Sequence, residues 1–128
     1  METDATLYDT VGGMGFFEAL VERFYEGVAT DPVLRRLYPA EDLGPATRRL
    51  TLFLAQYWGG PRTYDQERGH PALRMRHSPF GIGPKERDRW LAHMRDAITS
   101  LDPPPDVARA LTDYFGMAAE SLRNLDLG

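Results

Sequence analysis

The sequence predicts an all-α fold, and three observations support this prediction. Apolar residues recur at spacings of three and four along nearly the whole chain, as the buried face of a helix requires. No segment shows the sustained alternation of apolar and polar residues that is typical of a half-buried strand. Glycines and prolines separate the periodic segments from one another. We therefore expect four longer helices and two or three short ones.

The first half of the chain contains two of the long helices. The apolar stripe from 14 to 28 predicts the first, which ends before the Asp-Pro pair at 31–32. A short segment over 33–38 follows and is stopped by the next proline. The stripe from 46 to 57 predicts the second long helix, which begins near Pro45 because proline suits the first helical position.

The second half begins with an irregular region and continues with two more long helices. Residues 59–70 are expected to form an extended loop, and 71–77 a short helix. The third long helix is expected over 84–101, where the following prolines end it. Asp106 is expected to cap the last helix, whose apolar stripe continues almost to the C-terminus.

Length and composition indicate one folded domain over residues 1–128. The chain is 42% hydrophobic, which is too apolar for a disordered segment, and it contains no cysteine. It has no apolar run of membrane-spanning length, and its N-terminus is acidic, unlike that of a signal peptide. We expect a cytoplasmic protein.

The charge is unevenly distributed along the chain. Residues 62–95 carry eight basic and four acidic side chains, a net charge of +4, whereas the whole chain carries −4. The basic region could face an acidic ligand, nucleic acid or solvent. Solvent is the simplest interpretation, and we expect no nucleic-acid and no membrane partner.

The three histidines do not suggest zinc, because the chain has neither cysteine nor an HExxH pair. His77 lies at the expected end of a short helix and has two interpretations. A histidine there can simply interact with the helix dipole. Alternatively, its imidazole can be the axial ligand of a haem iron and leave the opposite face open for a gas.

Tyr25, Tyr38 and Trp90 lie on or beside apolar stripes, and each has a polar tip. They are either amphipathic residues at the edge of the core or donors that converge on one small polar ligand. The arginines at 49, 62, 74 and 76 are either solvated or suited to bind two carboxylates, such as the two propionates of a haem.

Several stretches of the chain form a more specific pattern. The longer ones are 57–61, 68–71 and 73–80, which read YWGGP, RGHP and LRMRHSPF. The shorter ones are 24–25, 37–39 and 86–91, which read FY, LYP and ERDRWL. With these motifs in this order, the chain resembles the truncated haemoglobins, and within them the second group, which is common in bacteria including actinobacteria. The resemblance extends from about Tyr8 to Leu125.

This resemblance implies a two-over-two helical sandwich, a truncated globin fold with an extended loop before the short proximal helix, around haem b (iron protoporphyrin IX). His77 resembles the proximal iron ligand. The distal ligand-binding group implied by the family comprises Tyr25, Tyr38 and Trp90, with Ala46 at the gate position and the apolar Leu50 one turn further in. The implied haem contacts are Arg49, Tyr64 and Arg76 for the propionates and Phe53, Leu54, Met75, Phe80 and Ile82 for the porphyrin.

The resemblance also implies haem-based binding of oxygen and other diatomic ligands such as CO and NO, for storage, transport, sensing or scavenging rather than enzymatic turnover. The alternative is a haem redox enzyme of the bacterial stress response, a peroxidase or an enzyme of nitric-oxide detoxification, with a reductase as electron donor. A helical binding module without haem is a third class, which a colourless protein from haem-replete cells would favour. The oligomeric state stays open, a homo-oligomer included.

Overall fold

The structure, a computed structural model, describes residues 6–38, 42–69 and 81–122. Every regular element in these ranges is a helix, which confirms the predicted all-α class. The longer helices are α2 (Met14–Ala29), α4 (Gly44–Tyr57), α7 (Pro84–Leu101) and α8 (Pro105–Leu122). The short ones are α1 (Leu7–Thr10), α3 (Pro32–Arg35) and α5 (Thr63–Arg68).

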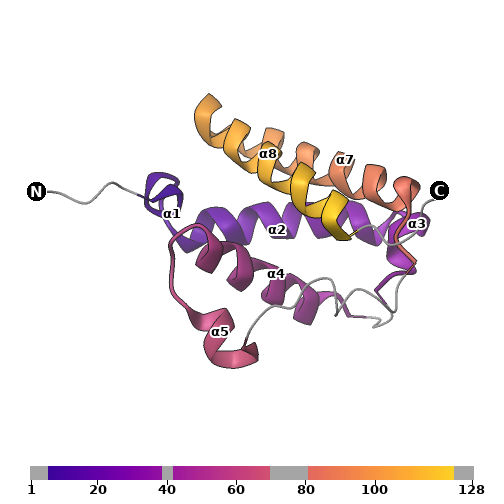
Figure 1. Cartoon of the computed structure of the whole chain (residues 1–128), viewed down its shortest axis with the longest axis horizontal. Coiled ribbons are helices and arrows are strands. Elements are labelled where there is room, and N and C mark those ends of the chain that lie inside the picture. The colour runs from indigo at the N-terminus through magenta and orange to yellow at the C-terminus, as the bar shows by residue number, and fades with distance from the viewer. Residues whose placement is uncertain (1–5, 39–41, 70–80, 123–128) are drawn as a thin grey trace, which may run out of the picture.

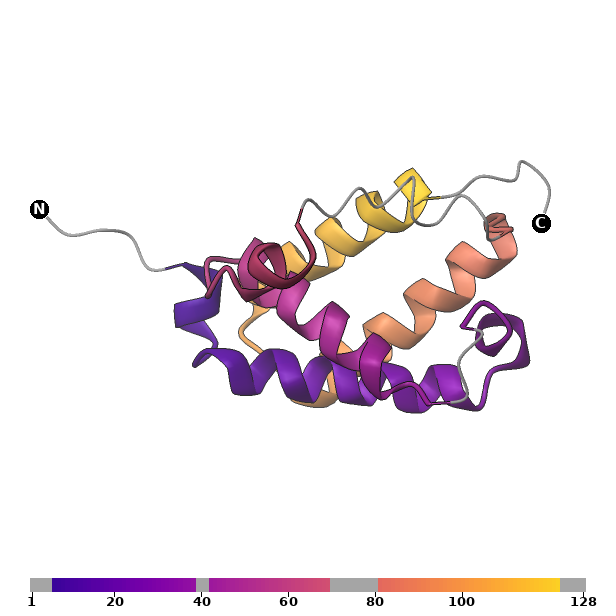
Figure 2. The same ribbon diagram turned by 90° about the horizontal axis from the view of Figure 1, so that it is seen from below.

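The four long helices form two layers of two. In Figure 1, α7 and α8 lie above α2, and α4 lies below it. Helix α2 packs against both α4 and α7, and α7 packs against α8, so α2 and α7 join the two layers. Figure 2 shows α4 running close to α2 at one end and diverging from α7 and α8 along its length. The arrangement is the expected two-over-two sandwich.

Helix α2 supplies the centre of the hydrophobic core. Phe17, Leu20 and Phe24 on its inner face are completely buried, and they lie at the three- and four-residue spacing seen in the sequence. Leu111 of α8 and Met94 of α7 are buried in the same cluster. Within the described residues, no helix has both the length and the hydropathy needed to span a membrane.

The region after α4 differs from the sequence prediction. Residues 59–70 were expected to be extended, but α5 occupies Thr63–Arg68. The side chain of Gln56 in α4 accepts a hydrogen bond from the Asp65 N–H and donates one to the Asp65 carboxylate, each at 3.0 Å. Gly69, with φ at +72°, ends the helix. Residues 71–77, expected to be helical, lie outside the described residues.

The beginning of α8 also differs. Asp106 was expected to be the N-cap, but the helix begins one residue earlier, at Pro105, so that Asp106 lies in the first turn. Proline is favoured at the first position because its missing N–H would have no partner there. The Asp106 carboxylate still interacts favourably with the positive end of the helix dipole.

Helices α2 and α7 approach each other closely at Gly27. A Cβ atom at this position would lie 2.3 Å from Nδ1 of His93 on α7, which is far inside van der Waals contact. The His93 ring cannot move away freely, because its Nε2 lies 2.7 Å from a carboxylate oxygen of the buried Asp31. The contact between the two layers at this point therefore requires glycine at position 27.

We expect Gly27→Ala to lower the free energy of unfolding by about 1–3 kcal/mol, because the added methyl group must displace His93 or the helix. Urea unfolding followed by circular dichroism measures the change. Gly15→Ala is the matched control: it lies in the same helix with nothing within 4 Å of the added Cβ, so alanine there should stabilise by about 0.5–1 kcal/mol. A Gly27→Ala protein as stable as the control would contradict the close contact.

Candidate functional site

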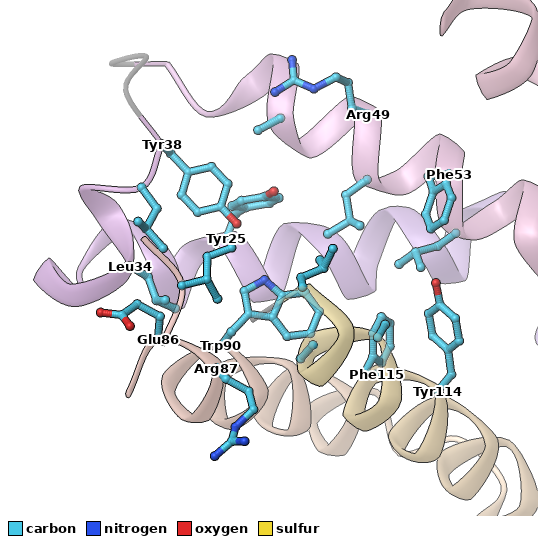
Figure 3. A pocket seen from close by; sticks show the side chains of 18 of the residues that line it. Tyr25, Leu34, Tyr38, Arg49, Phe53, Glu86, Arg87, Trp90, Tyr114 and Phe115 are labelled. Carbon is cyan, nitrogen blue, oxygen red and sulfur yellow. The ribbon is translucent and has the colours of Figure 1, made fainter. Parts of the chain in front are cut away.

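A cavity of about 470 Å³ lies between the helices of the two layers. Well-packed protein interiors contain few voids larger than a water molecule, so a space of this size in a small domain indicates a ligand site. Figure 3 shows side chains from α2, α4, α7 and α8 pointing into it. The walls are mainly aliphatic and aromatic, and polar groups are concentrated at a few places.

Every candidate site residue in the described part of the chain lines this cavity. They are Tyr25, Tyr38, Ala46, Arg49, Leu50, Phe53, Leu54, Tyr64, Ile82 and Trp90. Helices far apart in the sequence bring them together, since Tyr25 lies on α2, Arg49 on α4 and Trp90 on α7. The other candidates, Met75, Arg76, His77 and Phe80, lie outside the described residues.

The polar aromatic side chains meet on one side of the cavity (Figure 3). The Tyr25 hydroxyl and the Trp90 indole N–H both act as hydrogen-bond donors towards the Tyr38 hydroxyl oxygen, as their effects on the pKa values of the two phenols indicate. The rings of Tyr25 and Tyr38 pack edge to face, with centroids 5.5 Å apart and planes at 85°. Because the Tyr38 oxygen accepts both bonds, its own proton remains available to a further acceptor in the cavity.

Both phenols stay protonated at physiological pH. Burial raises the pKa of Tyr25. The neighbouring Tyr38, to which Tyr25 donates, raises this pKa further, whereas the positive charge of Arg49 lowers it. Burial also raises the pKa of Tyr38, although hydrogen bonds from Tyr25 and Trp90 and the positive charge of Arg49 act in the other direction. The cavity therefore presents neutral donors rather than phenolate anions.

Positive charge surrounds one part of the cavity wall. Arg49 and Arg68 line both the main cavity and a smaller one of about 240 Å³ beside it, which Tyr64 also lines. The side chain of Arg48 lines the smaller cavity and pairs with Glu67 at 2.5 Å. Guanidinium groups suit carboxylates in geometry and charge. The wall therefore fits a bulky apolar ligand that carries acid groups.

Nothing in the sequence indicated the wall contributed by α8, by the end of α5, by the segment around the end of α3 and by the first turn of α7. The residues missed as site residues are Leu34, Leu37, Arg68, Glu86, Arg87, Tyr114, Phe115, Ala118, Ala119 and Leu122. Those on α8 belong to an apolar stripe that looks the same whether it faces a core or a ligand. Burial and the neighbouring Tyr57 raise the pKa of Tyr114 to about 12, so this phenol is neutral as well.

The fold and this cavity define a helical protein of the globin class, built to enclose a prosthetic group. The model of the bacterial-like globin family matches residues 6–123, and the chain belongs to this family, among the truncated haemoglobins of group 2. It is 37% identical over 117 residues to the group 2 truncated haemoglobin YjbI of Bacillus subtilis, which covers 91% of this chain and 87% of that protein.

Two solved structures show the same relationship. The thermostable haemoglobin of the actinobacterium Thermobifida fusca is 58% identical, with a TM-score of 0.93 over 94% of this chain and 98% of that one. The group II truncated haemoglobin of Bacillus anthracis is 32% identical, with a TM-score of 0.94 over 99% of this chain and 97% of that one. Membership of the globin family implies that the chain binds haem and small ligands.

The donors around Tyr38 lead to a prediction about stability. We expect Tyr38→Phe to lower the free energy of unfolding by about 1–3 kcal/mol, because it leaves two buried donors without their acceptor. Tyr25→Phe should cost less, about 0.5–1.5 kcal/mol, because it removes one donor and leaves Tyr38 bonded to Trp90. Urea unfolding of both variants measures the difference. Equal losses would contradict the assignment of Tyr38 as the shared acceptor.

Proposed function

We propose that the cavity holds haem b and that the protein binds oxygen and other diatomic ligands there. The observation that carries this proposal is the convergence of Tyr25, Tyr38 and Trp90 on the cavity of a chain from the globin family. Bound in the cavity, haem would supply the iron that binds a gas. The donors of the protein then decide how tightly the gas is held.

His77 is the proposed axial ligand of the iron. Phe53, Leu54 and Ile82, which line the cavity, are proposed to contact the porphyrin. Met75 and Phe80 are proposed to complete this apolar wall, and Arg49, Tyr64 and Arg76 to bind the propionates. The guanidinium groups can form paired hydrogen bonds with carboxylates, which fits the positive charge along this wall.

On the distal side, the Tyr38 hydroxyl is proposed to donate its free proton to the ligand. The Trp90 N–H, which donates to Tyr38 in the structure, is proposed to be shared with the ligand, and the Tyr25 hydroxyl keeps Tyr38 in place. Donors act strongly in a cavity that excludes water. Hydrogen bonds to a polarised ligand contribute about 1.5–3 kcal/mol each, so gas release should be slow, which suits sensing or scavenging more than bulk delivery.

Ala46 and Leu50 are proposed to line the path of the ligand to this group. Both line the cavity from α4. Neither carries a polar group, so donation to the ligand depends on the tyrosines and Trp90. An alanine at the gate leaves more room for a gas than a histidine or a large aromatic residue would.

A haem redox function would use the same cavity and the same donors. Turnover of peroxide with a reducing dye distinguishes the two functions. A rate well above that of free haem would favour the redox enzyme, and a rate no better than free haem would remove it.

The proposed proximal ligand is tested by the visible absorption spectrum of the haem-loaded protein, reduced and then exposed to oxygen or carbon monoxide. We expect His77→Ala to abolish stable haem uptake or to leave an altered, weakly held chromophore, because the variant lacks the imidazole proposed to hold the iron. His70→Ala is the matched control and should keep the spectrum of the original protein. Unchanged ferrous spectra in the His77→Ala protein would exclude His77 as the ligand.

The distal donors are tested by oxygen release. We expect Trp90→Phe to speed it about 10- to 100-fold, because the variant keeps an aromatic ring but lacks the N–H. Stopped-flow displacement of oxygen by carbon monoxide measures the rate. Trp58→Phe is the control, since Trp58 does not appear among the residues lining the cavity and its buried N–H has no partner among the described residues. Release from Trp90→Phe at the original rate would leave Trp90 a packing residue only.

A further inference from the structure

Two buried carboxylates connect α3 to α7, and the proposed function uses neither. The first is Asp31, at the N-terminus of α3, which is only 3% exposed. One of its oxygens accepts the Val33 N–H at 3.0 Å. The other lies 2.9 Å from Nε of Arg89 and 2.7 Å from Nε2 of His93, both on α7. Asp31 therefore caps α3 and holds it against α7 at the same time.

The second is Glu86, in the first turn of α7, which is 7% exposed and lines the cavity. One of its oxygens accepts the Gly83 N–H at 2.8 Å, which closes the start of α7. The other lies 2.6 Å from the guanidinium of Arg36, directly after α3. Glu86 thus forms a second bridge between the same two helices, on the side nearer the cavity.

Both bridges join the segments that carry Tyr38 and Trp90. Tyr38 follows α3 by three residues, and its carbonyl accepts a hydrogen bond from the Arg35 side chain. Trp90 lies one turn after Glu86 and between the two α7 partners of Asp31, which are at positions 89 and 93. The separation of α3 and α7 therefore sets the separation of the Tyr38 oxygen and the Trp90 N–H.

We propose that Asp31 and Glu86 are positioning residues that hold Tyr38 and Trp90 in hydrogen-bonding distance and so set the donor strength of the distal side. This inference rests on the proposed function for its effect on a bound gas. Neither carboxylate donates to the ligand. Each acts through the helix that it holds, Asp31 through its contacts with Arg89 and His93, and Glu86 through Arg36.

The carboxyl groups of Asp31 and Glu86 are ionised at neutral pH, as the two bridges require. Burial opposes ionisation of Asp31, but hydrogen bonds from Arg89, His93 and Val33 outweigh it and lower its pKa to about 2. Burial likewise opposes ionisation of Glu86, and the Gly83 N–H and the charge of Arg36 lower its pKa. A lowered pKa means that the contribution to stability is complete above the ordinary carboxyl range and is lost only as the pH falls through the folded-state value.

The contacts that hold the Trp90 ring differ from those that hold Tyr38, which packs on Tyr25 and follows α3. The Trp90 ring contacts Phe24 and Phe115, with centroids 5.0 and 5.6 Å away, and neither contact involves α3. Loss of a bridge should therefore loosen the Tyr38 side and expose the indole N–H to exchange with water. This readout differs from that of a residue that only stabilises the fold.

The experiment follows hydrogen exchange of the two indole N–H groups by NMR in the haem-loaded ferrous protein with carbon monoxide bound. Glu86→Gln keeps an oxygen for the Gly83 N–H, and Asp31→Asn keeps one for the Val33 N–H, so each variant removes a bridge but not a cap. Trp58 is an internal reference for global unfolding, because its N–H is also buried. Glu26→Gln, which removes an exposed ion pair with Arg23 on α2, is the matched control.

We expect exchange at Trp90 to rise about fivefold to thirtyfold relative to Trp58 in both bridge variants, as a loss of one to two kcal/mol implies. Release of carbon monoxide should become faster in the same variants. Glu26→Gln should change neither quantity by more than about twofold. Arg36→Gln, at an exposed position, provides the same test for the Glu86 bridge if Glu86→Gln does not fold.

The inference is overturned if Tyr38→Phe increases Trp90 exchange but the bridge variants leave it unchanged or raise exchange at Trp58 equally. The carboxylates then only stabilise the fold. A protein that takes up no haem, or one whose gas release does not respond to Tyr38→Phe and Trp90→Phe, would instead overturn the proposed function, and this inference with it.

Discussion

The hydroxyl oxygen of Tyr38 is the point on which the arrangement of the cavity depends. It accepts one hydrogen bond from Tyr25 on α2 and another from Trp90 on α7, so it connects the segment after α3 with both layers of the sandwich. Burying three polar aromatic groups would be costly if their donors were unpaired. Two donors sharing one acceptor satisfy this requirement and leave a single O–H for a ligand.

The cavity itself is a departure from ordinary packing, and its walls explain why it persists. A void of about 470 Å³ forgoes dispersion contacts that a collapsed core would have. The long helices keep it open because α2 is fixed to α7 at Gly27 and α7 packs on α8. A ligand that fills the space restores those contacts, so binding and folding are coupled: whatever binds the folded state stabilises it by mass action.

Most of the fold was predictable from the sequence, because four helices with clear apolar stripes leave little freedom. The short helix α5 was not, since it depends on Gln56 contacting Asp65 nine residues away. The aromatic group of the site could be recognised from polar tips on apolar stripes. Glu86 could not, because a carboxylate normally indicates solvent and its partner Arg36 is fifty residues away. The residues of α8 that line the cavity could not be told apart in the sequence from residues that face a packed core. His77 lies outside the described residues.

The electrostatic arrangement explains what kind of ligand the cavity suits. The groups that face its polar side, Tyr25, Tyr38 and Trp90, are neutral donors. The buried negative charges are each paired, Asp31 with Arg89 and His93, and Glu86 with Arg36. A small ligand on this side therefore meets directed donors from neutral groups, and the positive charge of Arg49 acts on both phenols as well. Hydrogen bonds weaken steeply with distance and angle, so the helices that carry the donors must be fixed in place. Paired buried charges can fix these helices without adding a net charge to the cavity.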